Sequence, residues 1–276
     1  MDAAAALGLT TNTVVAMGMA DIPASAIGSG AVNTNDAHVY LGTSAWIGVT
    51  INTPKMVPKA GIASVPAADS KNCLLIGETE TAGACRDWLV KTLGISHDEI
   101  DQLATKAEAG AKSLIFSPWM QGERSPVPDE HVRGGFLNLG LQHGRPELAR
   151  AVLEGVALNL RWILDEITTT GQMCPTLRAI GGGAQSDVWL QILADISERP
   201  VQRVQHPRLA GAIGSALMAA VATGAVRDVA SIGPLIQTER CFLPNEANSA
   251  IYRCSLDAFR STHQPLSQLG QRLCPA

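Results

Sequence analysis

Short apolar runs alternate with longer segments of helical periodicity along most of this 276-residue chain. The runs predicted to form strands are 38–41, 45–51, 73–77, 113–116, 177–180 and 201–204. The segments predicted to form helices are 82–93, 98–109, 146–167, 186–196 and 209–226. Because a chain that alternates strands with helices builds a sheet and covers it with the helices, the pattern predicts an α/β fold.

The helix that begins at Pro146 has the clearest pattern in the sequence. Proline suits a first helical position because its backbone angle is already the helical one. Arg150 and Glu154 are opposite charges four residues apart, a spacing that brings two side chains together on a helix. We expect this pair on the outer face, away from the apolar positions Leu148, Val152, Val156, Leu160, Ile163 and Ile167.

The segment from Leu209 to Val226 carries no charge and is close to the shortest length that can span a bilayer. It consists mostly of alanine and glycine, which partition weakly into lipid. We therefore predict a buried helix that packs closely against the sheet, and no contact with a membrane.

The overall composition argues against several classes of protein. Hydrophobic residues make up 46% of the chain and charged residues 17%, which is compatible with a large core and not with global disorder. A formal net charge of −4 argues against a nucleic-acid partner. The six cysteines form no CxxC pair. The first residues include no Lys or Arg, so the charged start of a secretory signal is absent from this sequence. We therefore predict reduced thiols and a cytoplasmic protein.

The commonest nucleotide-binding and hydrolase motifs are absent from the sequence. It contains no GxxxxGK[ST] loop, no GxGxxG fingerprint, no HExxH pair and no GxSxG elbow. A nucleotide or phosphate site would therefore have to be built from other glycine-bearing turns.

Three such turns follow predicted strands or precede them. Gly42-Thr43-Ser44 joins two strands, where the glycine lets the backbone approach an anion and the hydroxyls can donate to it. Residues 181–184 join a strand to a helix, whose free N-terminal amides suit a phosphate. A plain hairpin and an unliganded turn remain alternatives for these two. Residues 26–30 are interpreted as a loop between lobes.

Five segments resemble the FGGY family of carbohydrate kinases, in the family's order and spacing. They are AIGSGAV with LGTSAWIGV, SPWMQGERSPVPDEHVRGGFLNL, ELARAVLEGVALNLRWILDEI, IGGGAQSDVWLQILADISERPV and AGAIGSALMAAVATG. Within the family, the sequences of these segments are most similar to those of the xylulose kinases. The resemblance implies an actin-like ATPase fold, in which sugar and nucleotide meet between two ribonuclease H-like lobes. It implies that this chain is the C-terminal, nucleotide-binding half, a mixed sheet flanked by helices.

The resemblance also implies a division of the chain. Residues 1–28 correspond to the end of the family's N-terminal, sugar-binding lobe, and 29–225 to the nucleotide-binding lobe. Residues 226–276 are expected to form a helical tail, with a helical pattern around 248–269. The family's early DxGT-type phosphate hairpin has no counterpart here, so we expect the first lobe to be missing or supplied by a partner chain. Apolar surface left open by that lobe would favour a homodimer.

Site residues follow from the same resemblance. Asp21 is implied to be the catalytic base that accepts the proton of the attacking sugar hydroxyl, although an aspartate that caps a loop is also compatible. Ile22 and Pro23 are expected to hold the backbone after it extended. The residues implied to bind ATP are Gly42, Thr43 and Ser44 at the β- and γ-phosphates, and Gly181, Gly182, Gly183, Ala184, Gln185 and Ser186 at the α-phosphate and adenosine. Mg²⁺ is implied as the counterion of the phosphates, with its protein ligands left open.

The predicted reaction is ATP-dependent phosphorylation of a sugar hydroxyl, with a ketopentose such as D-xylulose as the expected acceptor. Two other hypotheses remain open. One is a non-catalytic nucleotide-binding or assembly module of the same fold. The other is a hydrolase that uses Ser44, which would need a base and an oxyanion site that the sequence does not reveal. Glu123 and Arg124 are expected to form a structural pair that holds their loop.

Overall fold

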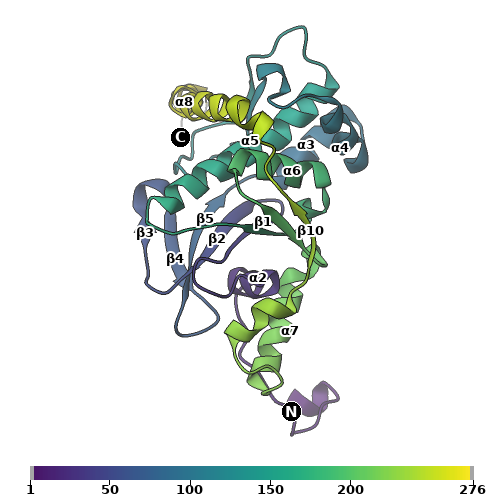
Figure 1. The fold of residues 1–276 in the computed structure, drawn as a ribbon, viewed down its shortest axis with the longest axis vertical. Coiled ribbons are helices and arrows are strands. Elements are labelled where there is room, and N and C mark those ends of the chain that lie inside the picture. The colour runs from purple at the N-terminus through teal and green to yellow at the C-terminus, as the bar shows by residue number, and fades with distance from the viewer. Residues whose placement is uncertain (1–2, 274–276) are drawn as a thin grey trace.

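The computed structural model describes residues 3–273, and a mixed eight-stranded sheet runs through it (Figure 1). The strand order is β10-β9-β8-β1-β2-β5-β4-β3. The strands are β1 (Ala37–Leu41), β2 (Ala45–Ile51), β3 (Met56–Val57), β4 (Ile62–Pro66), β5 (Cys73–Thr79), β8 (Leu177–Ile180), β9 (Val201–Val204) and β10 (Thr238–Phe242). β8 is parallel to both of its neighbours, β1 and β9, and the other pairings are antiparallel. A separate ribbon pairs β6 (Ile115–Ser117) with β7 (Gly135–Leu137).

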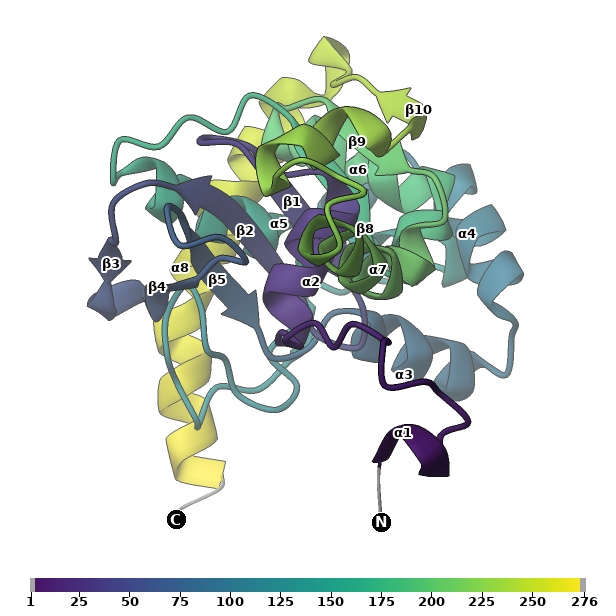
Figure 2. The same cartoon turned by 90° about the horizontal axis from the view of Figure 1, so that it is seen from below.

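Helices cover both faces of this sheet (Figure 1). On one face lie α3 (Gly83–Leu93), α4 (His97–Lys106), α5 (Arg145–Thr168), α6 (Asp187–Ser197) and α8 (Ser249–Leu273). On the other face lie α2 (Asp21–Ser29) and α7 (Ala210–Ala222). The segment that begins with α1 (Ala3–Ala6) extends away from the body of the molecule (Figure 2). The strands and helices predicted from apolar periodicity therefore form, with ends that differ by a few residues.

The long helix α5 is the centre of the core, as its pattern predicted. Val152, Val156 and Leu160 have no exposed surface. The expectation that Arg150 and Glu154 lie on an outer face is wrong, because α8 covers them. The Nε atom of Arg150 lies 2.7 Å from Oε1 of Glu154; the Glu154 side chain is buried, and that of Arg150 is 11% exposed. Burial raises the pKa of Glu154, and the nearby Arg150 charge opposes that rise.

Helix α7 packs mainly against α2, and its first residue, Ala210, packs with Ile180 and Val204 of the sheet. The prediction of a buried helix is wrong, because Ala210 and Gly214 are the only buried residues of α7. The two helices touch through their backbones. A Cβ atom at Gly214 would overlap the carbonyl oxygen of Ala24, and one at Gly28 would overlap that of Ala210. The small residues of this segment therefore serve a close helix crossing. None of the helices in residues 3–273 has the length and apolar content needed to cross a membrane.

Residues 26–30, predicted to be a loop, form the last turn of α2 and its end. Gly30 adopts a left-handed conformation with φ of 77°, and its amide donates to the carbonyl of Ile27 at 2.8 Å. Glycine tolerates this conformation without strain, which is why a helix often ends there. The helix crosses the boundary that the sequence placed between residues 28 and 29.

The last part of the chain contains more than the predicted helix. The helical pattern around 248–269 is confirmed by α8. Before it, β10 pairs antiparallel with β9 and forms the edge of the main sheet. This strand is polar and exposed except for Phe242, so it carries no apolar alternation that periodicity could detect.

Glu123 and Arg124 both hold their loop, but they do so through other partners. The buried carboxylate of Glu123 accepts hydrogen bonds from the Thr79 hydroxyl at 2.7 Å and from the Asn159 amide at 2.9 Å. It also accepts from the backbone amides of Glu80 and Arg124. Burial raises the pKa of Glu123 to about 7, and these donors oppose the rise. The guanidinium of Arg124 pairs with Glu80 and, at 2.9 Å, with Glu78.

The contact between α2 and α7 predicts an unusual response to alanine. Gly214→Ala should lower the free energy of unfolding by about 1–3 kcal/mol, because the new methyl group would overlap the Ala24 backbone. Helix propensity alone would favour alanine by about 1 kcal/mol, so the sign of the change is diagnostic. Urea unfolding measures the effect.

Gly211→Ala is the matched control in the same helix. A Cβ atom there would meet only the Ser25 hydroxyl, at an ordinary 3.8 Å, so this variant should be neutral or more stable. Equal behaviour of the two variants would contradict the close crossing.

Candidate functional site

The two glycine turns predicted to bind phosphate leave the sheet side by side. β1 and β8 are parallel neighbours, and their register pairs Tyr40 with Ile180. The first turn, Gly42-Thr43-Ser44, follows β1, and the second, which starts at Gly181, follows β8. Because parallel strands end at the same edge of a sheet, both turns open toward the same space.

The first turn is held by hydrogen bonds to the start of α3. The amide of Gly42 donates to the carbonyl of Ser44 at 2.9 Å. The carbonyls of Gly42 and Thr43 accept from the amides of Gly83 and Ala82, each at 2.8 Å. These bonds occupy the carbonyl groups of the turn, and Thr43 is exposed.

The second turn approaches the first at backbone distance. Gly181 has φ of 92°, and a Cβ atom on it would lie 2.5 Å from the carbonyl oxygen of Leu41. Only glycine fits both constraints. Gly182 is different, since a Cβ atom there would meet nothing within 4 Å. Ser186 then caps α6, and its hydroxyl accepts from the amide of Trp189 at 3.2 Å.

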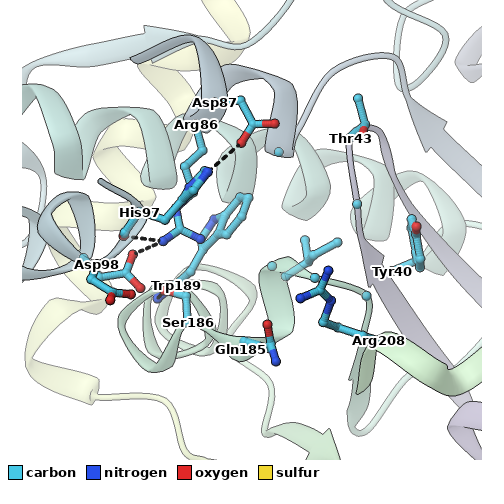
Figure 3. Close-up of a pocket in the computed structure, with 17 residues that line it drawn as sticks. Tyr40, Thr43, Arg86, Asp87, His97, Asp98, Gln185, Ser186, Trp189 and Arg208 are labelled. Carbon is cyan, nitrogen blue, oxygen red and sulfur yellow. Dashed lines mark hydrogen bonds and ion pairs between the residues drawn. The ribbon is translucent and has the colours of Figure 1, made fainter. Parts of the chain in front are cut away.

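A pocket of ≈ 700 Å³ opens above these turns (Figure 3). Most of the predicted nucleotide-binding residues line it, namely Gly42, Thr43, Gly181, Gly182, Gly183, Gln185 and Ser186. Ser44 and Ala184 belong to the same two turns but do not line the pocket. Ala184 has no exposed surface because its side chain packs in the core.

Asp21 lies apart from the residues that line this pocket. It is the first residue of α2 and is exposed, and its carboxylate accepts from the amide of Ile22 at 2.9 Å. The extended backbone expected for Ile22 and Pro23 is wrong, because both belong to the first turn of the helix. Proline is tolerated there since the amide it lacks would have no helical partner.

The side of the pocket formed by α3 and α4 is charged, which the sequence did not predict. Nη2 of Arg86 lies 2.9 Å from the carboxylate of Asp101 and donates to the carbonyl of His97 at 2.8 Å. Burial raises the pKa of Asp101, and the Arg86 charge opposes the rise. Asp87 lies 3.4 Å from Nε2 of His97 near the mouth. These residues are far from the glycine turns in sequence, so no local motif connects them.

Two aromatic residues and a histidine support the hairpin that carries the first turn. The rings of Tyr40 and Trp46 stack with their centroids 4.0 Å apart, and Tyr40 lines the pocket. Nε1 of Trp46 donates to Nε2 of His38 at 3.0 Å, so the histidine must be neutral to accept this bond. Burial lowers the pKa of His38 to about 4.

No group of three or more His, Cys, Asp or Glu side chains in the described residues could hold a metal ion. The carboxylates of Asp87, Asp98 and Asp101 border the pocket without converging on one point. A divalent cation at this pocket would therefore have to be coordinated mainly by a ligand and by water.

Comparison with known proteins gives consistent matches over nearly the whole chain. Residues 37–223 match the model of the FGGY family of carbohydrate kinases, C-terminal domain. The xylulose kinase of Escherichia coli (strain K12) is 33% identical over 269 residues, covering 97% of this chain and 55% of that relative. The gluconokinase of Bacillus licheniformis is 28% identical over 270 residues, covering 93% of this chain and 52% of that relative.

Solved structures agree with the sequence comparison. The ligand-bound xylulose kinase of Lactobacillus acidophilus superposes with a TM-score of 0.91 at 28% identity, covering 98% of this chain and 55% of that one. The predicted actin-like ATPase fold, a mixed sheet flanked by helices, is confirmed. The chain spans about half the length of the curated relatives it matches. These relatives are kinases, so the comparison gives no support to a non-catalytic module.

The buried histidine predicts a pH-dependent stability. The folded-state pKa of His38 is about 4, and the unfolded value is 6.5. Below pH 6.5 the unfolded chain takes up a proton that the folded chain refuses, so stability is lost as the pH falls toward 4. The loss from this group should reach about 3 kcal/mol. Urea unfolding at several pH values between 7 and 4 measures it.

His38→Gln should flatten this dependence, since an amide oxygen can accept from Trp46 without titrating. His97→Gln removes an exposed imidazole and serves as the control, with an unchanged slope expected. The assignment fails if His38→Gln and the unsubstituted protein lose stability in parallel.

Proposed function

The chain belongs to the FGGY family of carbohydrate kinases, and we propose that it supplies the ATP-binding half of an enzyme that phosphorylates a sugar hydroxyl. The observation that carries this proposal is the pocket shared by two glycine turns at the ends of neighbouring parallel strands. Such a pocket offers backbone amides and close approach, which an anionic ligand requires.

In the proposed pose, ATP lies along the pocket with its phosphates above the turns. The Gly42 backbone and the Thr43 hydroxyl would meet the β- and γ-phosphates, with Ser44 completing their turn. Gly181 to Ala184 would lie against the α-phosphate and the adenosine, and Gln185 and Ser186 at the start of α6 would continue that contact. The support for this pose is that Gly181 lies against the backbone of Leu41, directly before the first turn, so that both turns border the same pocket.

Asp21 is the proposed general base. As the sugar oxygen attacks the γ-phosphorus, the bond from that phosphorus to the β–γ bridging oxygen breaks, ADP leaves, and the hydroxyl proton passes to the Asp21 carboxylate. Such a base contacts the hydroxyl of the sugar and does not need to contact the nucleotide. Its exposure, outside the lining of the pocket, is compatible with that role.

Mg²⁺ is the proposed counterion of the nucleotide and would neutralise phosphate charge when bound. The residues present fit an ion that enters with the nucleotide, because the described residues offer no cluster of three carboxylate, imidazole or thiolate ligands. Thr43, which is exposed and lines the pocket at the first turn, is proposed to contact such an ion.

We propose a ketopentose such as D-xylulose as the acceptor, and D-gluconate as the competing candidate. The relative with 33% identity is a xylulose kinase, and a gluconokinase matches nearly as much of the chain. Most contacts that select the sugar would come from the family's N-terminal lobe. The second half of the cleft is therefore proposed to come from such a lobe or from a partner chain.

The segment before Asp21 supports a covering partner. Its side chains Leu7, Val14, Val15 and Met17 are exposed by 73%, 62%, 90% and 94%. Apolar side chains exposed to this degree favour contact with another lobe or with a second copy of the chain.

Gly182→Asp tests the nucleotide pocket. Gly182 has φ of −66° and ψ of −39°, which any residue adopts, and a Cβ atom there meets nothing within 4 Å. The variant should therefore fold normally and place a carboxylate beside the phosphates. We expect Mg·ATP binding to weaken by roughly a hundredfold or more, measured by calorimetry.

Gly182→Ala is the matched control and should bind Mg·ATP within a few-fold of the unsubstituted protein. Absence of Mg·ATP binding by the unsubstituted chain would overturn the proposed function. Equal binding by all three proteins would show that the nucleotide binds at another site.

Asp21→Asn tests the proposed base in a coupled assay of ADP release, with D-xylulose, with D-gluconate and without sugar. We expect sugar-stimulated release to fall by about 10²–10⁴-fold, because the amide cannot accept the proton. The affinity for ATP should stay within twofold, since Asp21 does not line the pocket. Unchanged release by this variant would assign the base elsewhere. ATP binding without release for any sugar would limit the proposal to nucleotide binding.

A further inference from the structure

One cationic side chain of the pocket, Arg208, has no anionic partner in the part of the chain that the structure describes. Arg208 lies in the short 3₁₀ turn Pro207–Leu209, lines the pocket and is exposed. By contrast, Arg86 on the opposite side pairs with Asp101 at 2.9 Å. A guanidinium that faces a pocket without a counterion can form strong, charge-assisted hydrogen bonds with an anionic ligand.

The backbone around Arg208 is fixed to the second glycine turn. The amide of Gly181 donates to the carbonyl of Pro207 at 2.9 Å, directly before Arg208. His206 adopts a left-handed conformation with φ of 56°, and its carbonyl accepts from the amide of Leu209 at 2.9 Å. The hydrogen bond between Gly181 and Pro207 therefore holds the backbone of Arg208 next to the second glycine turn.

The direction of the side chain agrees with this attachment. Figure 3 shows the guanidinium of Arg208 pointing into the pocket between Tyr40 and Gln185. The carboxylates of Asp87 and Asp98 lie across the pocket, on the side of α3 and α4. The pocket thus has a cationic side chain beside the second glycine turn and an acidic side formed by α3 and α4.

We propose that Arg208 binds the phosphate chain of the nucleotide, and so orients ATP with its phosphates over the glycine turns and its base toward α3 and α4. This inference rests on the proposed function. The planar guanidinium can donate two parallel hydrogen bonds to phosphate oxygens, which a lysine cannot do. The two glycine turns themselves contribute amides and a hydroxyl but no charge, so Arg208 would supply the positive charge at this end.

The test is calorimetric titration of the whole chain with ATP, ADP and adenosine, each with and without Mg²⁺. Arg208→Gln should weaken ATP and ADP by about tenfold to a hundredfold, since it removes hydrogen bonds to a charged group. Adenosine, which has no phosphate, should bind within twofold of the unsubstituted protein. Arg208→Lys should recover only part of the lost affinity, because lysine restores the charge but cannot donate two parallel hydrogen bonds to a phosphate.

Two controls separate this effect from unfolding and from general charge. The side chain is exposed, so the urea midpoint of Arg208→Gln should match that of the unsubstituted protein. Arg227→Gln removes an equal charge that is 82% exposed and paired with Asp228 outside the pocket, and it should change no affinity.

The outcomes are distinct. Equal losses for adenosine and ATP, or no loss for ATP, would overturn the role of Arg208 while leaving the nucleotide pocket in place. Failure of the unsubstituted chain to bind ATP would overturn the proposed function and this inference together.

Discussion

The parallel pairing of β1 with β8 is the constraint on which the site depends. The two strands are distant in sequence, yet their register sets Tyr40 beside Ile180, so that both chains leave the sheet at the same level. Gly181 then touches the backbone of Leu41 more closely than a side chain would allow. A slip of one residue would displace one turn by about 3.3 Å and remove this contact. The shared pocket is therefore a consequence of strand register.

Features that depend on neighbouring residues could be predicted from the sequence. The glycine turns are local strand-to-turn signals, and the buried pattern of α5 is a periodicity within one element. The fold class follows from the alternation of such elements. The prediction of an extended backbone at Ile22 and Pro23 was wrong, because proline disfavours a helical conformation in the residue before it in most contexts but also occurs in the first turn of helices. The sequence contains no signal that decides between the two there.

Features that depend on which elements meet could not be predicted. Glycine and alanine indicated that α7 packs closely but not that its partner is α2, since small residues suit a helix and a sheet equally. The pair of Arg86 and Asp101 and the position of Arg208 arise only when helices and turns from distant parts of the chain surround one pocket. Arg150 and Glu154 have the spacing of a surface pair, but α8 covers them in the fold.

The helix pair α2 and α7 connects the two halves of the proposed chemistry. Asp21 begins α2, and Arg208 lies in the turn that leads directly into α7. The crossing at Gly28 and Gly214 leaves no side chain between the two backbones, so neither helix can shift without the other. The amide of Gly181 ties the turn before α7 to the end of β8. The proposed base and the proposed phosphate ligand therefore share one rigid frame with the glycine turns, and phosphoryl transfer depends on such positioning.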